Sequence, residues 1–174
     1  MTITILAYCS YPHYEIYERL AGSLYDTGFS GNLCIFAETE NEENLKKLQK
    51  AYPKVKYVTG ENSWALLRAD HNRKNAAAHN VYRGRYELYK KYLEENEIKS
   101  KYVFISDSKD VLFQRNPEDY PIEEGYDLYV FAEGQKQIGQ CNRNWRWVRT
   151  ADILFETDTV PKLWKKQILC AGTT

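Results

Sequence analysis

The stretch VFISDSKDVLFQ, residues 103–114, sets two carboxylates and a lysine between two apolar runs. Residues 103–106 are typical of a buried strand, and a second apolar run starts directly after the polar segment 107–110. Because side chains alternate between the two faces of a strand, Asp107 and Asp110 point the same way only if the chain turns between them. The stretch therefore predicts a strand that ends in a polar turn.

Similar short apolar runs recur along the chain, and segments with helical spacing separate them. Predicted strands cover 3–10, 32–38, 55–60, 101–106 and 127–133, with 151–157 as a candidate sixth, and predicted helices cover 13–29, 41–53, a long stretch around 81–92, and 160–168. Strands that alternate with helices are typical of a parallel α/β sheet. We therefore predict a single domain over residues 1–174 with a mixed, mainly parallel sheet flanked by helices.

Composition limits the classes of protein to which the chain can belong. Its 174 residues suit one domain, and 43% hydrophobic with 28% charged residues is typical of a globular protein. Lysine and arginine together number 24, as do aspartate and glutamate, so the net charge is zero. Nucleic-acid-binding domains usually carry a basic excess, and we therefore expect no nucleic-acid partner.

The four cysteines, Cys9, Cys34, Cys141 and Cys170, form no Cys-x-x-Cys pair, which argues against a zinc site. The sequence shows no charged-then-apolar leader, and its apolar runs stay well short of the roughly 20 residues that span a membrane. We expect a reduced, cytoplasmic protein without a membrane span.

Polar residues follow three of the predicted strands, at 8–10, 38–39 and 107–110. The carboxyl ends of parallel strands lie at one edge of a sheet, where α/β proteins bind ligands. On the long helix, Arg85 falls about 40° from Val81 on a helical wheel, among apolar residues, so it points to the edge of the core. An unpaired guanidinium is costly there. Its partner is either a buried carboxylate or a ligand phosphate, and the sequence leaves both open.

The two carboxylates of the 107–110 turn are the oxygen ligands that Mg²⁺ or Mn²⁺ prefers. The alternative is that Asp110 pairs with Lys109 or Arg115 at the surface, but such pairs contribute only ~0–1 kcal/mol and explain little of the placement. The sequence contains neither a Gly-x4-Gly-Lys-Ser/Thr loop nor a Gly-x-Gly-x-x-Gly turn, so a nucleotide would be held by the metal and Arg85.

The segments RYELYKKYLEEN and KYVFISDSKDVLFQRNP together resemble nucleotide-sugar glycosyltransferases of the GT-A fold. More narrowly, they are similar to small viral, algal and microbial members in which an Asp-x-x-Asp turn replaces the common Asp-x-Asp motif. The later segments LYVFAEGQKQIGQCNRNW and ILCAGTT are similar to that group as well. Family members tend to continue past the CAGTT loop, and this chain stops at Thr174, so we also expect a trimmed or incomplete C-terminus.

The resemblance implies a metal-dependent enzyme that moves a hexose-type sugar from a nucleoside-diphosphate sugar, UDP rather than GDP, to a glycan or another hydroxyl acceptor. It places the donor on residues of the strand ends and the long helix: Ala7, Tyr8, Ser10, Arg85, Asp107, Ser108 and Lys109. Asp107 and Asp110 would hold Mn²⁺ or Mg²⁺, and Lys74 or Lys109 would add positive charge at the diphosphate. The alternative is a non-catalytic nucleotide-sugar-binding domain of the same fold, alone or as one module of a larger polypeptide.

The acceptor is expected in the later half of the chain, about 116–174, and the donor in the half before it, about 1–115. Segment 141–152 gathers asparagines, arginines and two tryptophans, and Trp145 and Trp147 share one face if the segment is a strand. An inverting transferase needs a carboxylate base for the acceptor hydroxyl. Asp152 and Glu133 are the candidates, and the sequence does not choose between them.

Overall fold

The computed structural model describes residues 2–59 and 76–170. The chain divides into two compact units, Met1–Glu123 and Glu124–Thr174, each with its own sheet. This division falls a few residues beyond the boundary near residue 115 that the sequence predicts between donor and acceptor halves. That the chain acts as a single domain stays a prediction.

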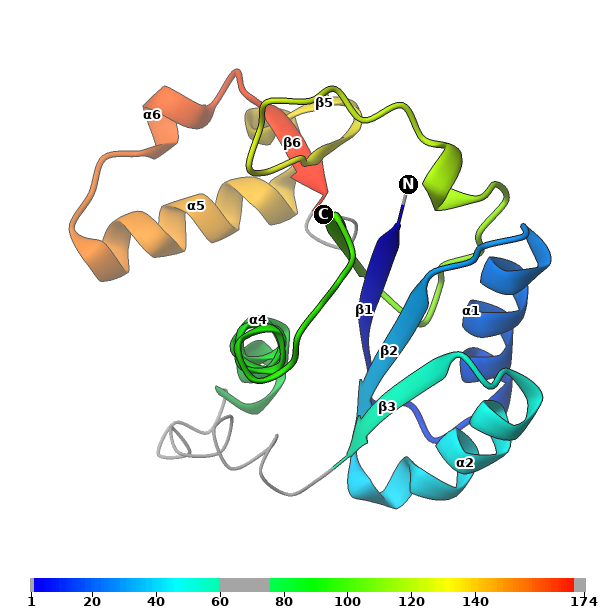
Figure 1. Cartoon of the computed structure of the whole chain (residues 1–174). Helices are drawn as coiled ribbons and strands as arrows, with labels where there is room; N and C mark the ends of the chain where they lie inside the picture. The colour runs from blue at the N-terminus through cyan, green and yellow to red at the C-terminus, as the bar shows by residue number, and fades with distance from the viewer. Residues whose placement is uncertain (1, 60–75, 171–174) are drawn as a thin grey trace. The chain divides into compact units, whose positions relative to one another are not determined.

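The first unit is built on a parallel sheet of four strands in the order β3-β2-β1-β4 (Figure 1). The strands are β1 (Ile3–Cys9), β2 (Asn32–Ala37), β3 (Val55–Thr59) and β4 (Tyr102–Ser106). All three strand pairs are parallel, and Ala7 lies opposite Ile35 on one side and Ser106 on the other. The prediction of a mainly parallel α/β sheet flanked by helices is thereby confirmed.

Strand β1 forms the centre of the sheet because its sequence is apolar on both faces. All seven of its residues are buried, as a strand covered on two sides requires. Ile3, Ile5, Ala7 and Cys9 belong to one core cluster, whereas Leu6 and Tyr8 belong to the other.

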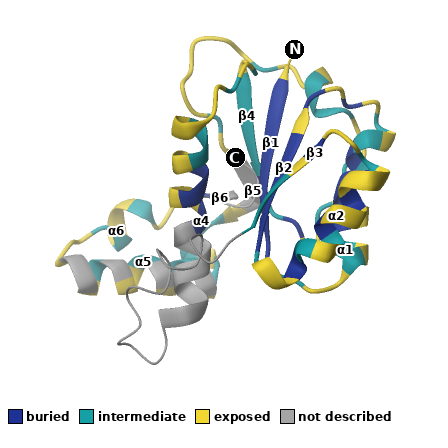
Figure 2. Ribbon diagram, turned by 60° about the horizontal axis from the view of Figure 1, so that its bottom comes forward, coloured by how far each residue is buried: buried dark blue, intermediate teal, exposed yellow. Residues whose placement is uncertain are grey.

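Helices cover both faces of this sheet (Figures 1 and 2). The first cluster joins one face to α1 (Tyr14–Asp26) and α2 (Glu42–Ala51), chiefly through leucines with helical spacing: Leu20, Leu24, Leu45 and Leu48. The second cluster joins the other face to α4 (Ala76–Glu95), through Leu88 and Tyr89. Short 3-10 turns follow β2 at Thr39–Asn41 and precede the end of the unit at Pro117–Asp119.

The strand order creates a topological switch point at β1. The chain leaves β1 towards β2 and β3 on one side, and it later places β4 on the opposite side. In open α/β sheets, ligands bind outside the carboxyl ends of the two strands that flank such a point. The fold thus directs attention to the ends of β1 and β4.

The second unit contains the antiparallel pair β5 (Phe131–Gln137) and β6 (Gln167–Cys170), with α5 (Asn142–Phe155), α6 (Val160–Leu163) and the 3-10 turn Ile138–Gln140 between them. Strand β5 begins later than the predicted strand over 127–133. The predicted helix over 160–168 ends early at Leu163, and β6 takes up its last residues.

The predicted strand over 151–157 is wrong, because residues 151–155 form the last turn of α5. A short apolar run does not by itself distinguish a strand from the end of a buried helix. The helix ends at Glu156, which adopts a left-handed conformation with φ of 52°. Across residues 2–59 and 76–170, none of the helices has the length and apolar character needed to cross a membrane.

Candidate functional site

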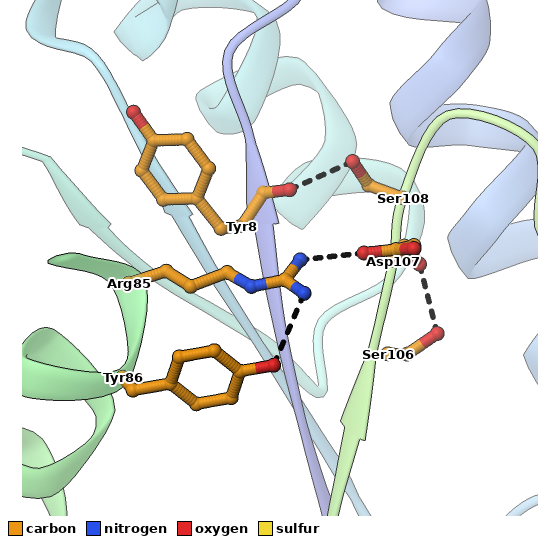
Figure 3. A network of polar contacts seen from close by, with 6 residues as sticks. All are labelled: Tyr8, Arg85, Tyr86, Ser106, Asp107 and Ser108. Carbon is orange, nitrogen blue, oxygen red and sulfur yellow. Dashed lines mark hydrogen bonds and ion pairs between the residues drawn. The ribbon is translucent and has the colours of Figure 1, made fainter. Parts of the chain in front are cut away.

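The candidate site lies at the carboxyl ends of β1 and β4. The paired register of these strands ends at Ala7 and Ser106. Beyond it, the Ser108 hydroxyl donates a hydrogen bond of 2.8 Å to the Tyr8 carbonyl, and Ser108 is only 4% exposed (Figure 3). The Ser106 hydroxyl donates to the Asp107 carbonyl at 2.8 Å. Ser108, a predicted donor contact, therefore fastens the turn to the central strand.

Arg85 reaches this turn from α4. Its Nη1 donates to Asp107 Oδ1 at 2.5 Å, and its Nη2 lies 3.3 Å from the Tyr86 hydroxyl, to which it donates (Figure 3). The Arg85 side chain is 9% exposed, whereas that of Asp107 is 45% exposed. Of the two partners for Arg85 that the sequence allows, a carboxylate or a phosphate, the structure shows a carboxylate. This carboxylate is partly exposed to solvent.

The position of Arg85 follows from the helical repeat. Leu88 and Tyr89, three and four residues later, pack on the sheet face formed by Leu6 and Phe36. Arg85 continues this buried stripe one turn earlier, at the level of the strand ends. The prediction that Arg85 lies at the edge of the core is confirmed by its 7% residue exposure.

Burial would lower the pKa of Arg85, but its hydrogen bonds to Asp107 and Tyr86 outweigh that effect and raise the pKa above its ordinary value. The guanidinium therefore keeps its charge at every working pH. Burial has the opposite effect on the pKa of the neighbouring phenols, because their neutral form is the protonated one. Burial raises the pKa of Tyr89, against the opposing charge of Arg85, and burial together with Glu38 raises the pKa of Tyr8. Both phenols stay protonated near neutral pH.

Tyr86 and Tyr89 are site residues that the sequence analysis did not select. Tyr86 is 38% exposed, its ring lies 5.1 Å from the Arg85 guanidinium carbon, and it meets the Tyr89 ring edge-on at 6.1 Å. The sequence feature that could have pointed to them is their position one and four residues after Arg85 on the same helix. Many core tyrosines show the same spacing, so this feature does not distinguish site tyrosines from core tyrosines.

The other predicted donor residues differ in how far they are exposed. Ala7 is fully buried between two strands, so its side chain offers a ligand no surface. Ser10 follows β1 and is half-buried, and Lys109 is exposed, with its ammonium 4.8 Å above the Tyr11 ring. The carbonyl of Lys109 accepts a hydrogen bond from Arg19 on α1. Lys74 lies outside the described residues.

Asp107 and Asp110 are the residues that could hold a metal ion. Asp110 is exposed, and Asp107 contacts Arg85 through Oδ1. The described part of the chain contains no group of three or more histidine, cysteine or acidic residues that could hold a metal. Mg²⁺ commonly binds to one or two carboxylates together with substrate phosphates. These two carboxylates would suit an ion of that kind only together with a phosphate ligand that supplies further oxygens.

A pocket of about 260 Å³ lies elsewhere, at the amino ends of the strands. It is lined by Thr4, Asn32, Lys56, Tyr92 and residues 97–99. Thr4, Asn32 and Lys56 lie at the starts of their strands, and residues 97–99 directly precede β4, so the pocket lies at the edge of the sheet opposite Asp107. The switch-point rule and the charged pair both favour the carboxyl edge.

In the second unit, Asp152 has a local structural role. Its carboxylate accepts hydrogen bonds from the Thr157 hydroxyl at 2.6 Å and from the backbone amides of Thr159 and Val160 at 2.9 and 2.8 Å. These bonds, that of Thr157 foremost, lower the pKa of Asp152. A carboxylate so engaged joins the end of α5 to the start of α6 and is a weak base. Glu133 lies within β5, and its side chain is outside the described part.

The tryptophans of segment 141–152 lie on a helix and not on a strand. At about 100° per residue, Trp145 and Trp147 are about 160° apart, so they do not share a face. Trp145 packs edge-on against Trp164 at 6.5 Å, and the Arg149 guanidinium lies 5.2 Å from its ring. The side chain of Trp147 is outside the described part. Trp145 is thus engaged in packing within its own unit.

Comparisons with models of protein families, with curated proteins and with solved structures find no match to this chain.

Proposed function

We propose that this chain is a metal-dependent glycosyltransferase that moves a hexose-type sugar from a nucleoside-diphosphate sugar to a glycan or another hydroxyl acceptor. As the donor, we favour a UDP-sugar over a GDP-sugar. The observation that carries the proposal is the Arg85–Asp107 pair, 2.5 Å apart at the switch point of a parallel sheet. A fixed cation beside a half-exposed carboxylate suits a ligand that brings both a diphosphate and a divalent ion. The strand order β3-β2-β1-β4 supports the GT-A fold as the finer assignment.

In this proposal, Arg85 binds the diphosphate, and its charge stabilises the negative charge that builds there as the sugar–oxygen bond breaks. Tyr86 holds the guanidinium in position through its hydroxyl. Asp107 and Asp110 would hold Mn²⁺ or Mg²⁺, which supplies a second positive charge to the leaving diphosphate when bound. Lys109, on the same turn and exposed, would add a further positive charge.

The nucleoside would lie near the ends of β1 and β4, by Ser10 and the largely buried Tyr8. Ala7 contributes its backbone place in the sheet and no contact of its side chain, since it is fully buried. Of the two candidate bases, we favour Glu133, because the hydrogen bonds of Asp152 make it a weak proton acceptor. Glu133 would act as this base if the reaction inverts the configuration of the sugar, because a retaining reaction does not need a carboxylate base for the acceptor hydroxyl.

The test is thermal unfolding against a panel of nucleoside diphosphates and nucleotide sugars, with Mn²⁺ and with EDTA. A ligand at 100 times its Kd should add about 2.7 kcal/mol, a shift of a few degrees for a chain of this size. We expect a manganese-dependent shift with a uridine nucleotide. Asp110→Ala should abolish the metal-dependent part, and Asp26→Ala, at an exposed aspartate near the end of α1, should not.

Donor turnover distinguishes the enzyme from a binding domain of the same fold. The enzyme should release free sugar from its donor slowly when Mn²⁺ is present and acceptor is absent. Nucleotide binding without any release would support the non-catalytic domain. The absence of any shift across the whole panel would contradict both.

A further inference from the structure

Arg85 and Asp107 form an ion pair and neutralise one another. Arg85 Nη1 contacts Asp107 Oδ1 at 2.5 Å, and the second terminal nitrogen, Nη2, donates to Tyr86. The guanidinium is almost fully buried, but the carboxylate is half exposed. The cation is therefore fixed inside the fold, and its counter-ion lies on the side that a ligand can reach.

This arrangement places a barrier against binding of an anion alone. A phosphate group that approaches Arg85 meets the negative charge of Asp107 on the same guanidinium. A divalent cation alone meets the converse obstacle, because it must break the ion pair between Asp107 and the buried guanidinium of Arg85, which is costly. Each ion removes the obstacle that the other one faces.

We propose that Asp107 is an exchangeable internal counter-ion: a diphosphate replaces it on Arg85 while a divalent cation takes up the released carboxylate. No covalent bond changes in this exchange, and the pair of charges in the fold stays balanced throughout. The inference rests on the proposed function for its ligand class, a diphosphate with a divalent ion. By linkage, the cation and the anion each raise the affinity of the other by the same factor.

Tyr86 is the positioning residue of this exchange. Its hydroxyl accepts from Nη2 of Arg85, and its ring flanks the guanidinium at 5.1 Å. Both contacts persist when Asp107 leaves, so the guanidinium keeps its orientation towards the incoming anion. Tyr86→Phe should therefore weaken pyrophosphate binding and leave the manganese affinity of the metal site unchanged.

The decisive experiment measures inorganic pyrophosphate binding by calorimetry in EDTA. Simple chelation, in which Asp107 only holds the metal, predicts no gain when this residue is neutralised. Exchange predicts that Asp107→Asn binds metal-free pyrophosphate at least about tenfold tighter than the wild type, equal to about 1.4 kcal/mol. It also predicts that Mn²⁺ improves pyrophosphate binding strongly in the wild type and little in Asp107→Asn.

Asp110→Asn is the matched control, since it removes the same charge from the same turn and no contact joins Asp110 to Arg85 among the described hydrogen bonds and ion pairs. A gain in Asp110→Asn equal to that in Asp107→Asn would reduce the effect to general electrostatics and overturn the proposal. The double variant Arg85→Gln/Asp107→Asn should lose the gain. A gain that survives without Arg85 would overturn the proposal as well.

Loss of its counter-ion can destabilise Arg85, so folding is itself a readout. Asp107→Asn and Asp107→Ser should unfold at lower temperature than the wild type, and pyrophosphate should restore them more than it stabilises the wild type. Variants that stay unfolded even with pyrophosphate would contradict the exchange, because the anion would then fail to replace the carboxylate.

The exchange and the proposed function fail in different ways. If no nucleotide or nucleotide sugar binds but Asp107→Asn still gains affinity for pyrophosphate, the exchange holds and the glycosyltransferase proposal fails. If a nucleotide sugar binds and turns over with Mn²⁺ but Asp107→Asn shows no gain, the function holds and the exchange fails.

Discussion

Ser108 Oγ donates to the carbonyl of Tyr8 at 2.8 Å, across the gap where β1 and β4 no longer pair. The two residues are 100 positions apart in the sequence, and both are buried. This bond fixes the start of the turn that carries Asp107 and Asp110. The position of the candidate site thus depends on this one hydroxyl.

Ser108→Ala should destabilise the protein by about 1 kcal/mol, the net contribution of an ordinary buried hydrogen bond. Urea unfolding should show a lower midpoint with an unchanged slope, because the surface exposed on unfolding stays the same. Ser10→Ala is the control, since Ser10 is half-buried near the same strand end. Equal midpoints for Ser108→Ala and the wild type would show that the bond contributes nothing net.

Gly31→Ala should destabilise the protein more than Gly28→Ala, because the first creates a steric clash and the second only strains the backbone. A Cβ at Gly31 would lie 2.1 Å from the Ile3 carbonyl oxygen, which belongs to the central strand and has little freedom to move. We expect a loss of about 3 kcal/mol, at the upper end for overpacking. Gly28 has φ of 83° with open space around it, so alanine there should cost only about 1 kcal/mol of backbone strain. Equal losses in chemical denaturation would contradict this account.

Asp152 should make the second unit sensitive to acid. Hydrogen bonds to its carboxylate lower its pKa in the folded chain, so the stabilisation is fully present above its unfolded pKa of about 3.9. It is lost as the pH falls from there through the lower folded pKa. Three of the four tryptophans lie in this unit, so their fluorescence reports its unfolding.

The stability difference between wild type and Asp152→Asn should therefore be large at pH 7 and smaller at pH 3. Asp158→Asn, at a neighbouring exposed aspartate, is the control for a change of charge alone. The same difference at both pH values would show that the carboxylate is not held by Thr157, Thr159 and Val160.

Thiol reagents should separate the cysteines by burial. Burial raises the pKa of Cys34 to about 11, so only about one thousandth of this thiol is ionised at pH 8, and Cys9 is fully buried. Cys141 is partly exposed and should react first with iodoacetamide, as read by peptide mass spectrometry. Denaturant should make Cys9 and Cys34 reactive together. Rapid labelling of Cys34 in the native protein would contradict its place under α4.

The parallel sheet of the first unit could be predicted because its strands are short apolar runs separated by amphipathic helices. The buried position of Arg85 could be predicted as well, from one helical wheel. Its partner could not, because a helix wheel shows which face a residue occupies and nothing about the turn opposite. Asp107 and Asp110 could be selected as a pair, but their different exposure follows from how the chain leaves β4.

The second unit was harder to predict for a physical reason. Residues 151–157 are apolar enough for a strand. Residues 151–155 are helical because they continue α5, which begins at Asn142. Asp152 looked like a free carboxylate in the sequence. Its partners follow it by five to eight residues, and they reach it only because the chain reverses after Glu156.

The central position of β1 has a consequence for how the protein is made. Strand β2 follows within about 25 residues, but β4 appears only some 90 residues after β1 ends. At roughly 5–20 residues per second on the ribosome, one edge of β1 stays unpaired for about 5 to 20 seconds before β4 is synthesised. A strand apolar on both faces with an open edge is an aggregation hazard. We expect chaperones to contact the nascent chain during this interval, and synonymous codons that slow translation between β3 and β4 should lower the soluble yield.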